Sequence, residues 1–163
     1  MLGEAVTPEG QAKLIEHEGE VLHAYQDSKG YWTIGIGHLI DKRKGGGIPQ
    51  RISRLLFADK VARVTAECRQ AFDWFDGLDE TRKDAIVNLC FNIGIENLKG
   101  FRNMIAAIQA GDWQRVHDEL LYADPSKGNW APNAYWTDVG DGPGKKFDRA
   151  EQVAMALKIG AWD

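Results

Sequence analysis

The chain reads EGEVLHAYQD over residues 18–27 and GYWTIGIGH over residues 30–38, and these two stretches decide its fold. Polar and apolar positions alternate along residues 31–36, which is typical of a β-strand with two different faces. Residues 27–30, DSKG, are of the types that form tight turns. We therefore predict a hairpin of two short strands, at about residues 22–26 and 31–36.

A helix is predicted immediately before this hairpin. Thr7, Pro8 and Glu9 have the residue types of a helix start, and Gly19 is a natural left-handed cap at its end. Glu18 then lies in the last turn, where the negative end of the helix dipole favours the protonated form of a carboxyl group. A protonated Glu can donate a proton to a leaving oxygen. A helix-end Glu is, however, more often structural or simply exposed.

Asp27 opens the predicted turn, where an aspartate commonly caps backbone N–H groups. The same hydrogen bonds would keep its carboxyl group ionised. An ionised Asp facing a protonated Glu is the division of roles that glycosidases use. Thr33 is either simply a good strand residue or the holder of a water molecule beside Asp27, and the spacing alone leaves both interpretations open.

The rest of the chain shows mainly helical periodicity. We predict a long helix over about residues 49–72, then helices at about 78–93, 101–109, 112–122 and 147–158. Residues 123–146 are rich in Pro, Gly, Asn and Asp and read as a loop. Its Trp130, Tyr135 and Trp136 either anchor the loop in the core or form a wall that stacks on substrate, with equal weight.

Composition excludes several classes of function. A chain of 163 residues with 44% hydrophobic and 27% charged residues is typical of one soluble globular domain. The net charge of −4 argues against nucleic acid as a partner. No apolar run is long enough to span a membrane, and no secretory signal is visible. We therefore expect no stable membrane insertion and a cytoplasmic location.

Cys68 and Cys90 lack the spacing of metal ligands and fall on predicted helices. In a chain without a secretion signal, we expect two free, partly buried thiols rather than a disulfide. The histidines form no cluster with them. We therefore expect no metal site and no cofactor.

The hairpin region resembles the T-even phage lysozyme family, glycoside hydrolase family 24. The resemblance rests on Glu18, Gly19, Tyr25, Asp27 and residues 30–39. It extends to NLCFNIG at residues 88–94, GF at 100–101, RA at 149–150 and GAWD at 160–163, which look like the family's central helix and its exit, its C-terminal helix and its terminal Trp. It therefore covers most of the chain.

The resemblance implies an α+β, lysozyme-like fold in a single catalytic domain over residues 1–163. A small hairpin lobe, about residues 18–48, and a larger helical lobe, about 60–163 plus the N-terminal helix, would be joined by the long helix. The active-site cleft would lie between the lobes.

The implied activity is hydrolysis, with inversion, of the β-1,4 bond between N-acetylmuramic acid and N-acetylglucosamine in peptidoglycan. Glu18 would be the general acid, while Asp27 and Thr33 would position and activate the attacking water. In an inverting enzyme the two carboxyl groups lie about 6.5–9.5 Å apart.

Further residues match supporting positions of the family. Leu39 and Phe91 would line the saccharide cleft, Arg149 would approach the catalytic Glu, and His38 would be a structural histidine that ties the hairpin to the helical lobe. Met104 and Glu119 depart from the family, because they stand where it has polar residues thought to touch substrate.

The resemblance implies a monomeric endolysin of a phage or prophage. It would wait in the host cytoplasm and reach the cell wall through a membrane pore at lysis. Two alternatives are a wall-binding relative without catalysis and a particle-associated lysozyme that opens the wall at infection.

Overall fold

The computed structural model describes residues 7–40, 46–133 and 149–162. Its elements group into two compact units, Met1–Leu56 and Phe57–Asp163, and each is described by itself. Helices and small antiparallel sheets confirm the predicted α+β class. None of the helices within the described ranges combines the length and the apolar character needed to cross a membrane.

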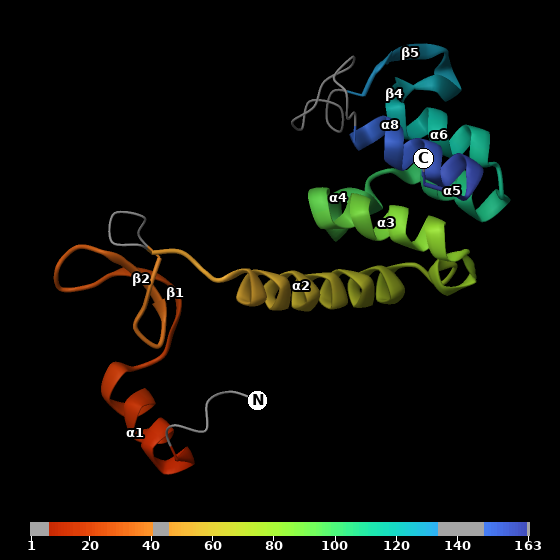
Figure 1. The fold of residues 1–163 in the computed structure, drawn as a ribbon. Helices are drawn as coiled ribbons and strands as arrows, with labels where there is room; N and C mark the ends of the chain where they lie inside the picture. The colour runs from red at the N-terminus through yellow and green to blue at the C-terminus, as the bar shows by residue number, and fades with distance from the viewer. Residues whose placement is uncertain (1–6, 41–45, 134–148, 163) are drawn as a thin grey trace. The chain divides into compact units, whose positions relative to one another are not determined.

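The first unit consists of a helix followed by a small sheet (Figure 1). Its elements are α1 (Pro8–Glu18), β1 (Val21–Gln26), β2 (Trp32–Gly35) and β3 (His38–Leu39). The strands are antiparallel in the order β1-β2-β3, with β2 in the middle. The predicted helix and hairpin are confirmed. The helix α1 belongs to this unit, and its predicted grouping with the helical lobe stays a prediction.

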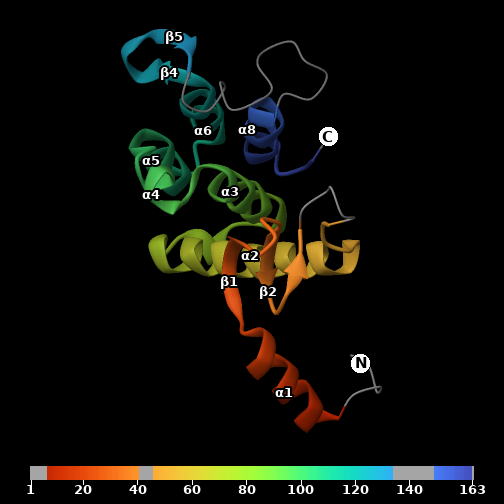
Figure 2. The same cartoon turned by 90° about the vertical axis from the view of Figure 1, so that its left-hand side faces the viewer.

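The boundary between the two units falls within the residues of helix α2 (Gln50–Ala71). The second unit is mainly helical (Figure 2). There follow η2 (Phe75–Gly77), α3 (Glu80–Ile93), α4 (Ile95–Lys99), α5 (Arg102–Ala110), α6 (Trp113–Leu121), β4 (Tyr122–Asp124), η3 (Pro125–Lys127), β5 (Asn129–Pro132) and α8 (Arg149–Ile159). Helix α6 packs against α5 and α8, and α8 also packs against α3.

The prediction of a loop over residues 123–146 is wrong for residues 123–132. Residues 122–132 form the antiparallel hairpin β4–β5, closed by the short helix η3. Gly128 ends η3 with a φ of 75°, a left-handed conformation that favours glycine. The remaining residues of the predicted loop, including Tyr135 and Trp136, lie outside the described residues.

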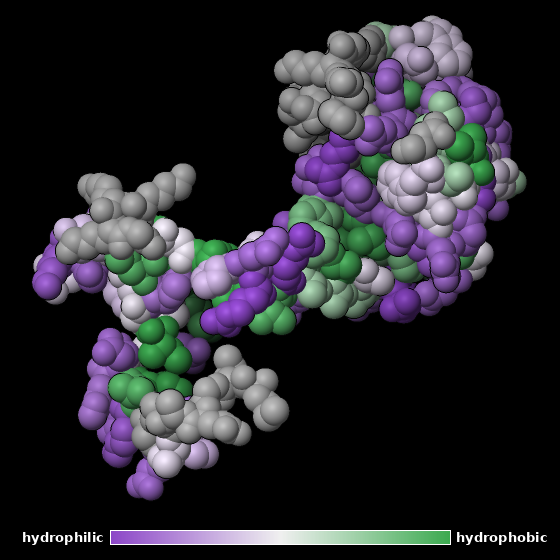
Figure 3. Space-filling model, in the orientation of Figure 1, coloured by the Kyte–Doolittle hydropathy of each residue, from purple (hydrophilic) through white to green (hydrophobic). Residues whose placement is uncertain are grey.

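The core lies inside the helical unit. Its largest fully buried side chains include Phe75, Ile86, Leu89, Leu120 and Leu157, from η2, α3, α6 and α8. The surface that this unit presents in Figure 3 is mostly hydrophilic. Burial of one apolar stripe from each helix, which is the main stabilising term in such a bundle, therefore holds the unit together.

Cys68 on α2 and Cys90 on α3 are free thiols that are both buried in this core. They are fully rather than partly buried. The hydrogen bond with Cys90, together with burial, raises the pKa of the Cys68 thiol well above its ordinary value. The thiols therefore act as small apolar side chains that pack α2 against α3.

Arg82 joins the beginning of α3 to the end of α8. Its guanidinium donates to the carbonyl oxygens of Leu157 at 2.8 Å and Lys158 at 3.1 Å, and it also pairs with Asp79. The same group lies 4.0 Å from the ring centre of Trp113. Since the last carbonyls of a helix have no partner within the helix, Arg82 supplies the missing donors and complements the helix dipole.

We expect Arg82→Ala to lower the free energy of unfolding by about 2–3 kcal/mol, because it removes charge-assisted bonds to half-buried carbonyls. The matched control is Arg63→Ala, since Arg63 is exposed and pairs with Glu67 on its own helix. That control should cost about 0.5 kcal/mol or less. Urea unfolding of the two variants measures the difference, and equal losses would contradict the role of Arg82.

Candidate active site

The three predicted catalytic residues all lie in the first unit. Glu18 is the last residue of α1, Asp27 follows directly after β1, and Thr33 lies in β2. Helix α1 ends at Glu18 because Gly19 takes a left-handed conformation, with a φ of 71°. The chain then turns directly into β1.

The Asp27 carboxylate closes the turn between β1 and β2. Its Oδ1 accepts hydrogen bonds from the backbone N–H groups of Lys29 and Tyr31, both at 2.8 Å. The backbone N–H of Asp27 donates to the Tyr31 carbonyl at 2.9 Å. The capping role predicted for Asp27 is therefore confirmed. Two N–H donors on one oxygen also stabilise the ionised form of the group.

Thr33 is buried in the middle strand, with 5% of its surface exposed. It pairs with Tyr25 on β1 and with Leu39 on β3. Its Oγ1 donates to the Tyr31 carbonyl at 3.3 Å, so the hydroxyl is directed back toward the turn that Asp27 closes. This hydrogen bond occupies the hydroxyl proton. The Thr33 oxygen can therefore still accept a hydrogen bond but not donate a second one.

The Glu18 carboxyl group lies against the turn between β2 and β3. A Cβ atom added at Gly37 in that turn would stand 3.0 Å from Glu18 Oε2. Gly37 also has a φ of 62°, which disfavours any residue with a side chain. A glycine at this position therefore allows both the turn and the close approach of the carboxyl group.

His38 and Leu39 both form hydrogen bonds with Gly47. The His38 Nε2 atom forms a hydrogen bond with the Gly47 carbonyl at 2.8 Å, and the Gly47 N–H donates to the Leu39 carbonyl at 3.3 Å. His38 thus has a structural hydrogen bond inside the first unit. Its predicted tie to the helical lobe stays a prediction. Leu39 is half-buried beside Thr33.

Phe91 and Arg149, the other predicted site residues, belong to the second unit. The Phe91 ring lies 6.0 Å from that of Phe57, and the Lys60 Nζ atom stands 3.8 Å above its centre. The Arg149 guanidinium donates to the side-chain oxygen of Asn88 from Nε at 2.9 Å and from Nη2 at 2.8 Å. Their predicted roles beside the saccharide and Glu18 stay predictions.

Trp130 is the one of the three predicted loop aromatics that lies within the described residues, and it is not anchored in the core. It lies on β5 with 56% of its surface exposed. Its ring packs edge-to-face on Tyr122 of β4, with the ring centres 5.3 Å apart. The core-anchor interpretation is therefore wrong for this residue.

Comparison with known proteins fits this arrangement. The phage lysozyme family matches residues 15–132, which include the last turn of α1 with Glu18, the sheet and most of the helical unit. The chain belongs to the phage lysozyme family.

Individual relatives agree with this assignment. A probable T4-type lysozyme of Dictyostelium discoideum is 30% identical, in an alignment that covers 63% of this chain and 76% of the relative. An endolysin of Acyrthosiphon pisum secondary endosymbiont phage 1 is 27% identical over 76% of this chain and 83% of its own length. The pre-baseplate central spike protein Gp5 of Enterobacteria phage T4 is 28% identical over 67% of this chain, but over only 24% of the spike protein. The chain is a lysozyme, and its substrate is peptidoglycan.

The contact between Gly37 and Glu18 gives a matched pair of variants. Gly37→Ala and Gly35→Ala both place a side chain at a positive φ, 62° and 66°, so each should lose about 1–2 kcal/mol of stability. Only the Cβ at position 37 meets Glu18, because nothing lies within 4 Å of the one at Gly35. Glu18 is the predicted general acid, and small displacements of a reacting group are costly. We therefore expect Gly37→Ala alone to slow wall hydrolysis by about tenfold or more.

The measurement is the clearing rate of purified cell walls at a temperature at which both variants are folded. Equal rates for the two variants would show that the position of the Glu18 carboxyl group does not matter to the reaction.

Proposed function

We propose that this lysozyme cleaves the β-1,4 bond between N-acetylmuramic acid and N-acetylglucosamine with inversion, and that Glu18 is its general acid. The support is the contrast between two carboxyl environments in one small unit. Glu18 stands at the carbonyl end of α1, whereas Asp27 accepts two backbone N–H groups. Accepting two backbone N–H groups favours the carboxylate form of Asp27, which is the form that the base of the proposed reaction needs.

The reaction needs one group that donates a proton to the leaving oxygen and one group that accepts a proton from water. Glu18 would protonate the glycosidic oxygen as its bond to the anomeric carbon breaks. A water molecule would attack that carbon from the opposite face of the sugar ring and lose its proton to the Asp27 carboxylate. The bond from the sugar to water replaces the bond to the leaving sugar, so the configuration at the anomeric carbon inverts.

Thr33 would hold the attacking water beside Asp27. Because its hydroxyl proton is donated to the Tyr31 carbonyl, the oxygen can accept a hydrogen bond from water. The same carbonyl receives the Asp27 N–H, so the strand pairing links the positions of Asp27 and Thr33. Both residues are positioned by the backbone of the hairpin, and no cofactor enters the proposed reaction.

Phe91 and Leu39 would line the saccharide site, with Arg149 approaching Glu18. The enzyme would act as a monomeric endolysin, held in the host cytoplasm until a membrane pore opens at lysis. The similarity to a central spike protein favours a second setting for the same chemistry, a lysozyme carried by the phage particle.

The test of the general acid is clearing of permeabilised Gram-negative cells by Glu18→Gln. Since general acid catalysis contributes about 10²–10⁴-fold, we expect clearing to fall by at least about a hundredfold. The matched control is Glu16→Gln on the same helix, where Glu16 is exposed and pairs with Lys13. Equal clearing by wild type and Glu18→Gln would contradict the assignment of Glu18 as the general acid. A folded wild type that clears no cells would favour a binding protein without catalysis.

A further inference from the structure

A polar pocket of about 430 Å³ lies in the second unit, between α6 and the β4–β5 hairpin. Its volume is within the range of small-ligand sites, about 300–1,000 Å³. The lining side chains that matter here are Asp112, Gln114, Asp118, Glu119, Ser126 and Trp130. The proposed reaction gives none of these residues a role, although Glu119 stands where the family has a polar residue thought to touch substrate.

Trp130 supplies a fixed aromatic wall. Its edge-to-face contact with Tyr122 and the pairing of β4 with β5 hold the ring in place, while 56% of the residue is exposed. Burying that much indole surface would be favourable, and nothing in the described chain does so. A ligand with a flat apolar face would fit this wall.

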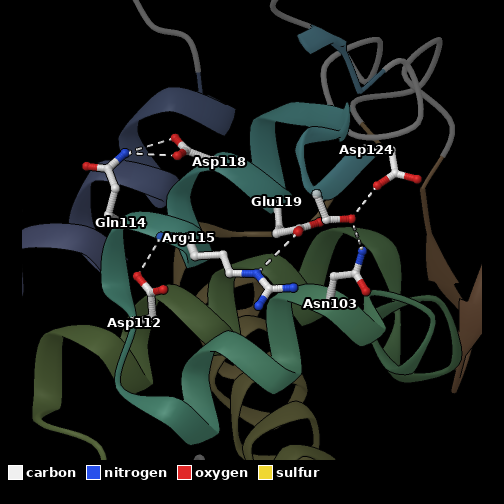
Figure 4. A network of polar contacts seen from close by, with 8 residues as sticks. Asn103, Asp112, Gln114, Arg115, Asp118, Glu119 and Asp124 are labelled. Atoms are coloured by element: carbon white, nitrogen blue, oxygen red, sulfur yellow. Dashed lines mark hydrogen bonds and ion pairs between the residues drawn. The ribbon is translucent and has the colours of Figure 1, made fainter. Parts of the chain in front are cut away.

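Helix α6 contributes hydrogen-bonding groups to the pocket lining, among them Gln114, Asp118 and Glu119 (Figure 4). The Gln114 amide donates to the Asp118 carboxylate at 3.0 and 3.1 Å, and the His117 ring lies 2.8 Å from the same carboxylate. The Glu119 side chain is 5% exposed and pairs with Arg115 at 3.5 Å. These contacts hold the polar groups in defined positions before any ligand binds.

The connection between β4 and β5 adds the hydroxyl group of Ser126 to the lining. Ser126 Oγ donates to Asp124 at 2.6 Å, and the Asn103 amide lies 3.5 Å from it. The Ser126 oxygen can still accept a hydrogen bond from a ligand. The pocket thus combines an aromatic face with acceptors from two elements.

Charge decides the class of ligand. Three carboxylates, those of Asp112, Asp118 and Glu119, line the pocket with one guanidinium, that of Arg115. This excess of negative charge disfavours phosphate or carboxylate ligands. Ionised carboxylates only accept hydrogen bonds, so their complement is a neutral ligand that is rich in hydroxyl donors.

We propose that this pocket binds a neutral N-acetylglucosamine unit of the glycan strand. The sugar would place the C–H face of its ring on Trp130 and its hydroxyl groups on the α6 carboxylates. This proposal takes its ligand from the substrate of the proposed function. N-acetylmuramic acid is the poorer fit, because its lactyl group carries either a negative charge or the bulk of the peptide stem. The pocket would keep the enzyme on the wall between cuts.

The experiment uses the full chain with Glu18→Gln, so that the substrate persists, and measures binding to insoluble glycan strands freed of stem peptides. We expect Trp130→Ala to weaken binding about fivefold or more and Trp130→Phe to retain part of the affinity. Trp162→Ala is the matched control, since Trp162 is 43% exposed and lines no part of the pocket. Equal urea midpoints for the variants would show that the fold is intact.

Equal binding by Trp130→Ala and the parent would overturn the proposal. The proposal would also be overturned if Trp130→Ala lost binding only to walls that keep their stem peptides. That result would indicate that the pocket binds an amino group of the peptide and not a sugar. Release of soluble glycan during the assay would count against Glu18 as the acid, and not against the pocket.

Discussion

The two hydrogen bonds from the N–H groups of Lys29 and Tyr31 to the Asp27 carboxylate fix the turn on which the candidate active site depends. The turn sets the pairing of β1 with β2, and that pairing places Thr33 opposite Tyr25. The next turn brings Gly37 against Glu18. A group that closes a turn by accepting N–H donors is thereby also kept ionised, so one interaction serves both fold and chemistry.

Local sequence signals predicted the helix α1, the β1–β2 hairpin and the helix α3, because each has its own end signals or its own periodicity. Strand β3 was missed because two residues cannot show an alternating pattern, and its pairing with β2 is a contact between segments. Helix α4 was missed because its five residues follow Gly94, which provides no side-chain cap. The β4–β5 hairpin was hidden by turn-forming residues, which also suit a loop.

Individual residues of the candidate site were predicted only at positions that match the family pattern. The capping role of Asp27 follows from its place in a turn, but the approach of Glu18 to Gly37 depends on tertiary packing that no local pattern records. Met104 and Glu119 depart from the family pattern, and both are buried, at 1% and 7% exposure. The exposure of Trp130 likewise depends on a strand pairing, so the sequence left its two interpretations open.

The account rests on two carboxyl groups with different tasks, one giving a proton and one activating water. The most direct measurement is the anomeric configuration of the first product, followed by proton NMR during rapid hydrolysis of a defined peptidoglycan fragment. The account predicts that the α-anomer forms first from the β-linked substrate and then mutarotates. First appearance of the β-anomer would mean a covalent intermediate, with Asp27 or another group as the nucleophile, and would contradict it.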